Sequence, residues 1–472
     1  IVLKSLKLNA LSTLQMSNLL TTQLRALTES QISSLSSVNL NALTSVQFQA
    51  LTTFQVSKLT TLQIASLETA DLVALTSSQL RALTPSSFGV LRSEEVTAFT
   101  TQQISYLSNA QITSLSTTNL KALTTDQFKA LTTSQVNSLI ANHLASLESS
   151  NLAVLSSNQI KAIPLAGIAA LTTQVIVSLT SEQFAFLSVT QVASLTTTQL
   201  AVLESQDLKA LTTLQITALT KPQLNSLSSI QMSDLMTNQV RALTLLQIST
   251  LSTVNLNALT TSQFQQLTTA QIEKLNTQQI VSLETSDLAS LTTNQIFSIT
   301  PKNISLLSTQ EIIALKTDQV RALSETQIKA LTSLQLASLE VDDIQALSST
   351  QLQNLSVLQL NSLSTSQMSS LLTTQLASLT PLQISTLSTV NLNSLTTSQF
   401  QALTPGQIVV LNTRQVSNLE TADLLSLNSS QLRAISVVGI GALRADEATS
   451  LTTQWISSLS NTQIPGLSST NL

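Results

Sequence analysis

An eight-residue period constrains the fold of this chain more than any other feature. Counting every eighth residue from position 3 to position 467 gives 59 positions, and all hold leucine except Phe99, Ile163, Ile299 and Ile435. The residue five places after each of these is apolar throughout, with Ala448 the weakest case. The consensus octad is L-[S/T]-x-x-Q-φ-x-[A/S], where φ is Ile, Leu, Val, Phe or Met. Such strict self-similarity predicts one continuous stacked array over residues 1–472.

Each octad carries a helix-start signal. Its second position holds Ser or Thr, and its fifth holds Gln in 37 of the 59 octads, as in Thr124 and Gln127. This spacing is the capping box, in which the hydroxyl and the Gln side chain satisfy backbone N–H groups at a helix start. A capping box every eight residues predicts a helix start every eight residues.

Proline supports the same interpretation. A proline at the first helical position costs nothing, because the N–H that it lacks would have no partner there. Four prolines directly follow the capping Thr: Pro85, Pro301, Pro381 and Pro405. Pro222 lies one place further on, still in the first turn, whereas Pro465 fits badly and is expected to cut its helix short.

Three architectures compete for this pattern. In a continuous helix or coiled coil the apolar positions would drift about 80° per octad, so we exclude it. A β-solenoid is the alternative, because Thr, Val and Ile favour strands. However, leucine and φ are separated by odd numbers of residues, which places them on opposite faces of a strand, and only six Gly are available for turns. We predict an all-α solenoid of very short capped helices, one per octad, stabilised by stacking because isolated helices this short are unstable.

A longer period lies above the octad. Six octads begin with Leu-Glu, at positions 67, 147, 203, 283, 339 and 419, and the intervals between them alternate between ten octads and seven octads. Together the two intervals give a 136-residue period of 17 octads, which divides the array into superrepeats 67–202, 203–338 and an incomplete 339–472. Either block duplication or a whole number of superhelical turns explains this spacing. Because the chain opens at Ile1 and stops within an octad, we expect it to be a fragment of a longer protein.

Composition restricts the partners. Charged residues are only 9% and aromatic residues 3% of the chain, so we expect a neutral surface of Ser, Thr, Gln and Asn. A net charge of −4 argues against nucleic acid and anionic membranes as partners. Lys and Arg recur at the seventh octad position, as in Arg25 and Lys121, and are expected to aid solubility. No apolar run approaches the roughly 18 residues of a membrane helix, and the absence of Cys excludes disulfides and thiolate metal sites.

No residue combination indicates a catalytic, cofactor or metal site, and we expect no enzyme. His143, the only histidine, occupies a Gln position without partners and is expected to face solvent or to replace a cap. A nucleophilic serine would need an activating base. The adjacent acidic pairs Glu94–Glu95 and Asp446–Glu447 diverge by about 100° on a helix, so we interpret them as surface residues.

The Leu-Glu octads place two carboxylates at a helix start, as in Glu68 with Asp71 and Glu340 with Asp343. The helix dipole favours negative charge there. Calcium would need six to eight oxygen ligands, which one or two carboxylates per octad do not supply. We therefore predict no metal.

Aromatic residues are predicted to fill the core. Among the ten Phe residues, Phe48, Phe128, Phe184, Phe264 and Phe400 stand at φ. Trp455 replaces a Gln at the fifth position, and we consider it a candidate exposed contact.

Two resemblances follow from these motifs. LTPLQISTLS from Leu379 and LTPGQIVVLN from Leu403 resemble the first helix of transcription activator-like effector repeats, but the second helix and base-reading loop have no counterpart, so DNA binding is not implied. The whole chain is more similar to LTT-x-Q-φ-x-AL octad arrays of very long bacterial proteins that are secreted or surface-attached. That resemblance implies no functional residues.

The function expected from the sequence is structural: an extracellular or cell-surface filament, stalk or adhesin shaft that self-associates end to end or laterally. The alternative is a repetitive Thr and Ser surface that binds polysaccharide or ice, for example through Thr132 with Thr133 and Thr172 with Thr173. A protein-interaction scaffold is a third hypothesis.

Overall fold

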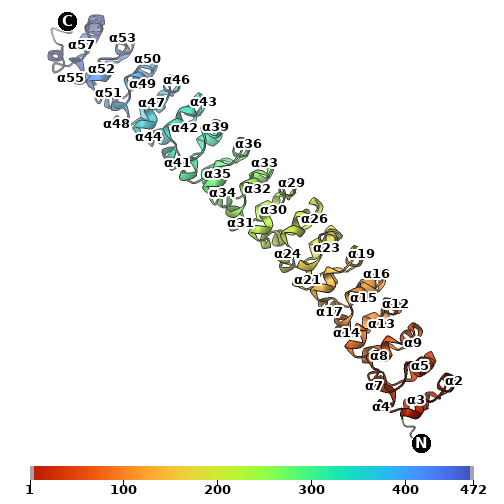
Figure 1. Ribbon diagram of the computed structural model, residues 1–472. Coiled ribbons are helices and arrows are strands. Elements are labelled where there is room, and N and C mark those ends of the chain that lie inside the picture. The colour runs from red at the N-terminus through yellow and green to blue at the C-terminus, as the bar shows by residue number, and fades with distance from the viewer. Residues whose placement is uncertain (1–4, 468–472) are drawn as a thin grey trace. The chain divides into compact units, whose positions relative to one another are not determined.

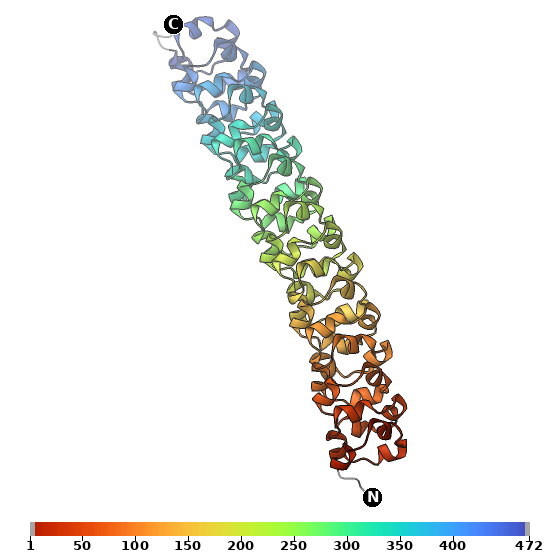
Figure 2. The same cartoon turned by 45° about the vertical axis from the view of Figure 1, so that its right-hand side comes forward.

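The computed structural model describes residues 5–467 and is all-α over that range. It contains 57 α-helices of four to six residues, from α1 (Ser5–Leu8) to α57 (Thr453–Ser458), followed by the 3-10 helix η1 (Ile464–Gly466). No strand occurs among these residues, so the α-solenoid prediction is confirmed and the β-solenoid alternative is wrong. The chain forms two units, 1–242 and 243–472, and in each unit the short helices follow one another as an array (Figures 1 and 2).

The octad folds as its cap predicts. In α16 (Thr125–Lys129), the Thr124 hydroxyl accepts a hydrogen bond of 3.2 Å from the Gln127 N–H, and the Gln127 side chain accepts one of 2.9 Å from the Thr124 N–H. Extended backbone at the cap (φ −65°, ψ 158°) starts the helix, and it ends after about one turn at Ala130. The capping-box prediction is therefore confirmed.

The prolines lie where the sequence places them. Four helices begin on proline: α11 (Pro85–Gly89), α38 (Pro301–Ile304), α48 (Pro381–Ser385) and α51 (Pro405–Ile408). Pro222 lies in the first turn of α28 (Lys221–Asn225). Pro465 lies in η1 rather than in an α-helix, as its poor fit to the pattern predicts.

Three octads make one turn of the solenoid. In unit 1, α6 (Ser45–Ala50) packs on α3 (Thr21–Arg25) before it and on α9 (Thr69–Ala74) after it. In unit 2, α50 (Thr397–Ala402) packs in the same way on α47 (Thr373–Ser378). Each helix thus stacks on the third helix along the chain, which gives a coil of three octads and three columns of helices.

This coil size bears on the 136-residue period. Within unit 1, the Leu-Glu octads of α9 and α26 (Ser205–Ala210) are 17 helices apart. Seventeen is not a multiple of three, so the two helices stand in different columns. With three helices per coil, 17 octads are not a whole number of coils, so the period does not return equivalent octads to the same column.

The core consists of the first-position and φ side chains. Phe128 is fully buried and Leu131 is 3% exposed, and the φ phenylalanines named from the sequence all lie in the core as predicted. A buried side chain of this size contributes about 1.5–3 kcal/mol, and most octads bury two. Because one helix cannot enclose them, stacking between coils supplies the stability.

One expectation about the surface is wrong. Gln was counted among the residues that cover the surface, but the fifth-position Gln is buried, as in Gln79 (2% exposed) and Gln135 (1% exposed). Exposed positions are instead the second, third, fourth and seventh of the octad. The reason for the burial of Gln is a second set of hydrogen bonds.

Candidate functional site

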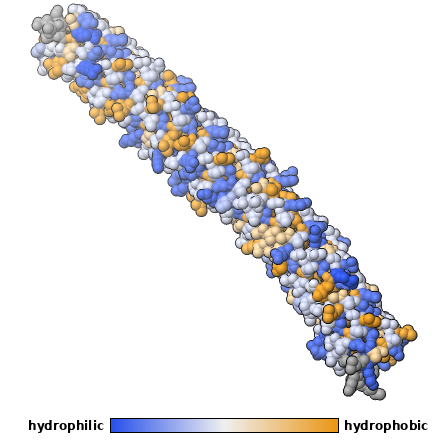
Figure 3. Space-filling model, viewed as in Figure 1, coloured by the Kyte–Doolittle hydropathy of each residue, from blue (hydrophilic) through white to orange (hydrophobic). Residues whose placement is uncertain are grey.

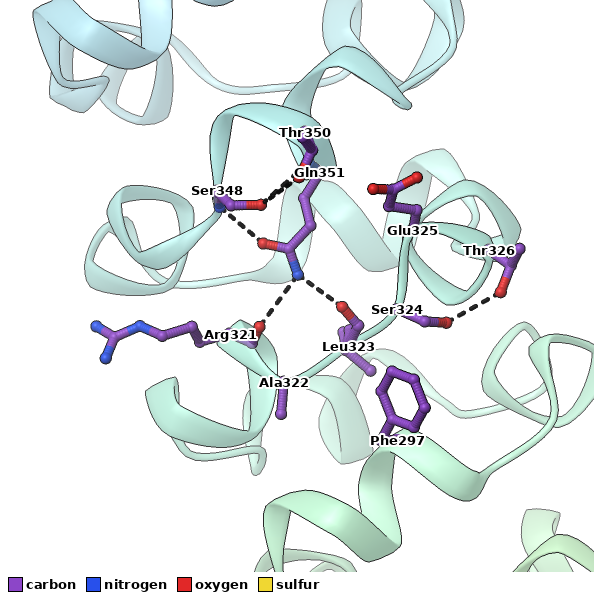
Figure 4. Close-up of a pocket in the computed structure, with 10 residues that line it drawn as sticks. All are labelled: Phe297, Arg321, Ala322, Leu323, Ser324, Glu325, Thr326, Ser348, Thr350 and Gln351. Carbon is purple, nitrogen blue, oxygen red and sulfur yellow. Dashed lines mark hydrogen bonds between the residues drawn. The ribbon is translucent and has the colours of Figure 1, made fainter.

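The fifth-position Gln bonds two helices at once. In α44 (Ser349–Gln353), Oε1 of Gln351 accepts a hydrogen bond of 2.7 Å from the Ser348 N–H. Its Nε2 donates to the carbonyl oxygens of Arg321 at 3.2 Å and Leu323 at 2.7 Å. These carbonyls end α40 (Thr317–Arg321) in the preceding coil (Figure 4). We call this arrangement the glutamine clamp: one amide caps the start of its own helix and the end of another.

The glutamine clamp repeats with a fixed register. Nε2 of Gln79 donates to the carbonyl oxygens of Phe48, Gln49 and Leu51 at 2.9, 3.3 and 2.7 Å. These acceptors lie in the preceding coil, at the end of one of its helices. The last carbonyls of a helix lack intrahelical partners, and the clamp supplies a donor to them. The sequence predicted the cap but not this bond between coils.

Two surface hollows adjoin each other in unit 2. The first, of about 510 Å³, is lined by Phe297, the linker Ala322–Ser324 and the start of α44 (Figure 4). The second, of about 610 Å³, shares Phe297, Ser324 and Thr326 with it. Phe297 is 61% exposed, whereas the Gln351 amide is held by the clamp. The hollows thus present an aromatic face beside hydroxyl groups rather than an array of reactive groups.

His143 is buried, so the expectation that it faces solvent is wrong and the alternative of a cap replacement holds in part. It is 3% exposed, and its Nε2 contacts the Leu115 carbonyl oxygen of the preceding coil at 3.0 Å, as a clamp Gln does. Burial lowers the pKa of His143, which favours the neutral ring. Nδ1 is buried and has no partner, so the ring does not reach its own helix start.

Trp455 and two acidic residues also differ from expectation. Trp455 is 3% exposed, and its Nε1 donates to the Leu424 carbonyl at 3.4 Å, so the exposed-contact interpretation is wrong. Glu95 and Glu447, interpreted as surface residues, are fully buried. Their carboxylates accept hydrogen bonds from the backbone N–H groups of Arg92 and Arg444 at 2.7 and 2.6 Å. Fifth-position side chains are buried whatever their polarity where a preceding coil covers them, whereas Gln15 and Gln23, near the start of the array, are exposed.

Five of the six Leu-Glu octads place an Asp in this buried position. Glu68 starts α9 without a side-chain cap hydrogen bond, and Asp71 is 6% exposed. Burial, followed by repulsion from Glu68, raises the pKa of Asp71 to about 6. Dipole complementation was the expected effect, but desolvation dominates because the carboxyl group lies between coils.

Two further aspartates repeat this environment. Burial, followed by repulsion from Glu284, raises the pKa of Asp287 to about 6, and burial with Glu420 does the same for Asp423. Within residues 5–467, no group of three or more His, Cys, Asp or Glu side chains is placed to hold a metal ion. In the same range, no helix has the length and apolar character needed to cross a bilayer.

Two of the short fifth-position residues have a helper in the preceding coil. Asn391 does not reach its own helix start, and the Ser388 N–H instead donates to Oδ1 of Asn361 at 2.7 Å. Asn39 and Asn9 repeat this arrangement, with the Ser36 N–H donating to Asn9 Oδ1 at 2.8 Å. In each case the helper stands at the seventh position of its own octad. The sequence contains this pairing of a fifth-position Asn with a seventh-position Asn, but the octad consensus does not show it.

Comparison with known proteins identifies the repeat. The family model described as the ALTTAQ repeat matches residues 64–101, 104–141 and 200–237. No curated protein matches the chain. The three matched segments share the octad frame that continues through the chain and that folds into stacked capped helices. The chain is therefore a repeat-array protein, and three of its segments are similar to the ALTTAQ repeat.

Proposed function

We propose that this chain is a non-enzymatic structural array that self-associates into an extracellular or cell-surface filament, stalk or adhesin shaft. The observation that carries the proposal is the stacking interface. Each coil presents clamp donors on one side and carbonyl acceptors on the other, above a continuous apolar core. Such a head-to-tail interface can repeat without closing. The same surface that stacks coils within a chain is therefore suited to stack one chain on another.

Apolar stripes support lateral association. Leu14, Val38 and Leu62 occupy the fourth octad position of three helices in one column of unit 1, and they are 66–80% exposed. These helices are α2 (Thr13–Ser17), α5 (Ser37–Asn41) and α8 (Thr61–Ala65). Figure 3 shows apolar residues in scattered patches on the face that it draws.

Unit 2 repeats the stripe. Leu334, Leu358 and Leu382 are 66–78% exposed and are spaced by three octads, on α42 (Ser333–Ser338), α45 (Val357–Asn361) and α48. Asn361 donates to the Thr386 carbonyl at 2.8 Å, which joins α45 to the end of α48. A stripe at the coil spacing offers a second copy the same spacing, and exposed apolar patches mark association surfaces.

Negative-stain imaging over a range of concentrations tests the proposal. Wild-type chain is expected to form fibres or bundles, and L334S/L358S/L382S is expected to lose lateral bundling. L214S/I230S/L246S is the matched control, because these side chains are 69–73% exposed but do not follow the coil spacing. Isolated particles of the wild-type chain at every concentration would contradict self-association.

Polysaccharide binding is the second candidate, favoured by Phe297. The exposed ring of Phe297 lies between two hydroxyl-lined hollows, an arrangement that suits the apolar face of a sugar ring. Thr132 and Thr172, which the sequence offered for this role, already accept hydrogen bonds from backbone N–H groups as helix caps. We expect Phe297→Ala to abolish retention on an immobilised polysaccharide, with Phe54→Ala, at a ring that is 59% exposed elsewhere, as control. Equal retention of both variants would remove this candidate.

A further inference from the structure

Three buried aspartates stand where the array needs a hydrogen-bond donor. At the fifth position, the amide of Asn119 donates to the Leu91 carbonyl at 2.7 Å, and the amide of Asn303 donates to the Leu275 carbonyl at 3.0 Å. Aspartate has the shape of asparagine but, when ionised, no donor. By the same register, the carboxylates of Asp71, Asp287 and Asp423 face carbonyl oxygens of the preceding coil.

A second acceptor lies at each of these sites. The seventh-position residue of the preceding coil that acts as helper elsewhere is here Asn41, Asn257 or Asn393, and in all three the Oδ1 is buried without a partner. Their amide nitrogens donate instead to the carbonyl oxygens of Ser66, Ser282 and Asn418. Asp287 is 4% exposed, and its Oδ2 also has no partner. By the coil register, each site therefore places a buried aspartate beside an asparagine Oδ1 that has no hydrogen-bond partner, and at Asp287 the carboxylate Oδ2 lacks one as well.

The charged groups around the clusters are mostly acidic. Asp287 lies in α36 (Thr285–Ser290), which has Glu284 at its cap, and α39 (Thr309–Ile313), which packs on α36, carries Glu311. The helices of the preceding coil, α32 (Thr253–Asn257) and α33 (Thr261–Gln266), carry no charged residue. No cation from these helices can balance the Asp287 carboxylate.

The other two sites include an arginine that is already engaged. Glu68 lies at the start of the helix that carries Asp71. The helix α12 (Ser93–Ala98), which packs on α9, carries Glu94 and Glu95 and has Arg92 at its cap. The Arg92 Nε donates to Glu95 at 3.0 Å. Helices α5 and α6 of the preceding coil carry no charged residue.

Asp423 lies in α53 (Thr421–Ser426) and meets Glu420 at its own helix start. The helix α56 (Ala445–Ser450), three helices further along the chain, carries Asp446 and Glu447 and has Arg444 at its cap, and Arg444 pairs with Glu447 at 3.0 Å. Helices α49 (Thr389–Asn393) and α50 of the preceding coil carry no charged residue.

We propose that Asp71, Asp287 and Asp423 are acid-responsive links between coils: each carboxyl group, once protonated, donates a hydrogen bond to an oxygen of the preceding coil and tightens the stacking. The raised pKa of about 6 at all three sites agrees with this role. Because the folded pKa lies above the unfolded value of about 4, the folded chain binds protons more tightly. The added stability is fully present below about pH 4 and is lost as pH rises through about 6.

Two other fifth-position aspartates provide an internal contrast. Asp207 accepts a hydrogen bond of 2.9 Å from the Ser181 hydroxyl, and Asp343 is hydrogen-bonded by Thr317. The helper positions that correspond to them hold Val177 and Ile313, not Asn. These two sites therefore have a donor and lack the amide oxygen, and they are not included in the proposal.

Thermal unfolding of the full chain, followed by circular dichroism at about pH 7.5 and pH 5.0, tests the proposal. We expect the wild-type Tm to rise by at least about 2 °C on acidification. D71N/D287N/D423N carries a permanent donor at each site, so its Tm is expected to be higher at pH 7.5 and its rise smaller. The control D126N/D318N/D342N removes three exposed carboxylates and is expected to keep the wild-type rise. An equal rise in the two triple variants would overturn the proposal.

Infrared titration of the wild-type chain provides a readout that does not depend on variants. A carboxylic-acid carbonyl band is expected to appear with a midpoint near pH 6 and to be absent from D71N/D287N/D423N. Lack of a band with that midpoint would overturn the proposal. Calcium chloride at pH 7.5 is expected to leave the Tm unchanged. A calcium-dependent rise in Tm that D71N/D287N/D423N loses would show that the oxygen cluster holds a cation rather than a proton. That result would also overturn the proposal.

Discussion

Two adjacent octads of unit 1 differ in how they join the preceding coil. In α10 (Ser77–Ala82), Thr76 caps the helix and Gln79 clamps it to the carbonyls of Phe48 and Leu51. In α9, neither the side-chain cap nor the clamp is formed, yet Leu72 is as fully buried as Leu80. The apolar pattern is thus sufficient to place a helix, and the clamp determines how firmly that helix is held.

Removing the clamp from α10 should produce the largest effect. Gln79→Leu leaves the Thr76 N–H and the Leu51 carbonyl without a partner inside the stack, at a cost of about 1–3 kcal/mol for each buried unsatisfied group. The Phe48 carbonyl loses one donor but keeps the Leu51 N–H. Urea denaturation followed by circular dichroism measures this loss in the free energy of unfolding. Gln102→Leu, at an exposed position of α13 (Thr101–Tyr106), should stay within about 0.5 kcal/mol. Equal midpoints for the two variants would show that the clamp adds nothing.

Installing a clamp in α9 should have the opposite sign. Asp71→Gln supplies both the cap acceptor and the donor to the preceding coil, so we expect stabilisation of about 1–2 kcal/mol at pH 7.5. The gain should shrink at pH 5, because Asp71, with a pKa of about 6, is then protonated and donates as well. The same urea titration at both pH values checks this. A gain that grows on acidification would contradict the comparison.

The two helix starts should respond unequally to truncation. Thr76→Ala removes the hydroxyl that accepts the Gln79 N–H at 3.3 Å and should cost about 1 kcal/mol. Glu68 makes no side-chain cap bond, so Glu68→Ala should cost less in stability and should lower the pKa of Asp71 by removing its repulsion. Calorimetry and an NMR titration of Asp71 measure the two effects. A larger loss at Glu68 would reverse the assignment of the caps.

The smallest effect should appear at Asp207. Burial raises its pKa, and the hydrogen bond from Ser181 opposes that rise. Ser181→Ala should therefore raise the pKa of Asp207 further, towards the behaviour of Asp71, with little change in the far-UV spectrum. NMR titration of the carboxyl group measures this shift. An unchanged pKa would mean that the hydroxyl does not hold the carboxylate.

Sequence alone determined the helix starts and the buried faces, because caps and apolar periodicity are local. It could not give three octads per coil, which depends on how helices pack. For the same reason His143, Trp455 and Glu95 were misplaced: whether the fifth position faces solvent depends on carbonyls of the preceding coil, which are distant in the sequence. Pairs such as Asn41 with Asp71 carried that information, but only the coil register makes them neighbours.

The clamp register also determines how such an array can change in length. Because each clamp Gln reaches back to equivalent carbonyls of the preceding coil, gaining or losing a whole octad restores every contact, whereas a one-residue insertion would misalign all the clamps that cross it. The array can therefore gain or lose residues only in whole octads, each of which is one helix and a third of a coil. This accounts for a frame without a single insertion over 59 octads, in which the Leu-Glu octads recur at intervals of ten and seven octads that are not whole numbers of coils.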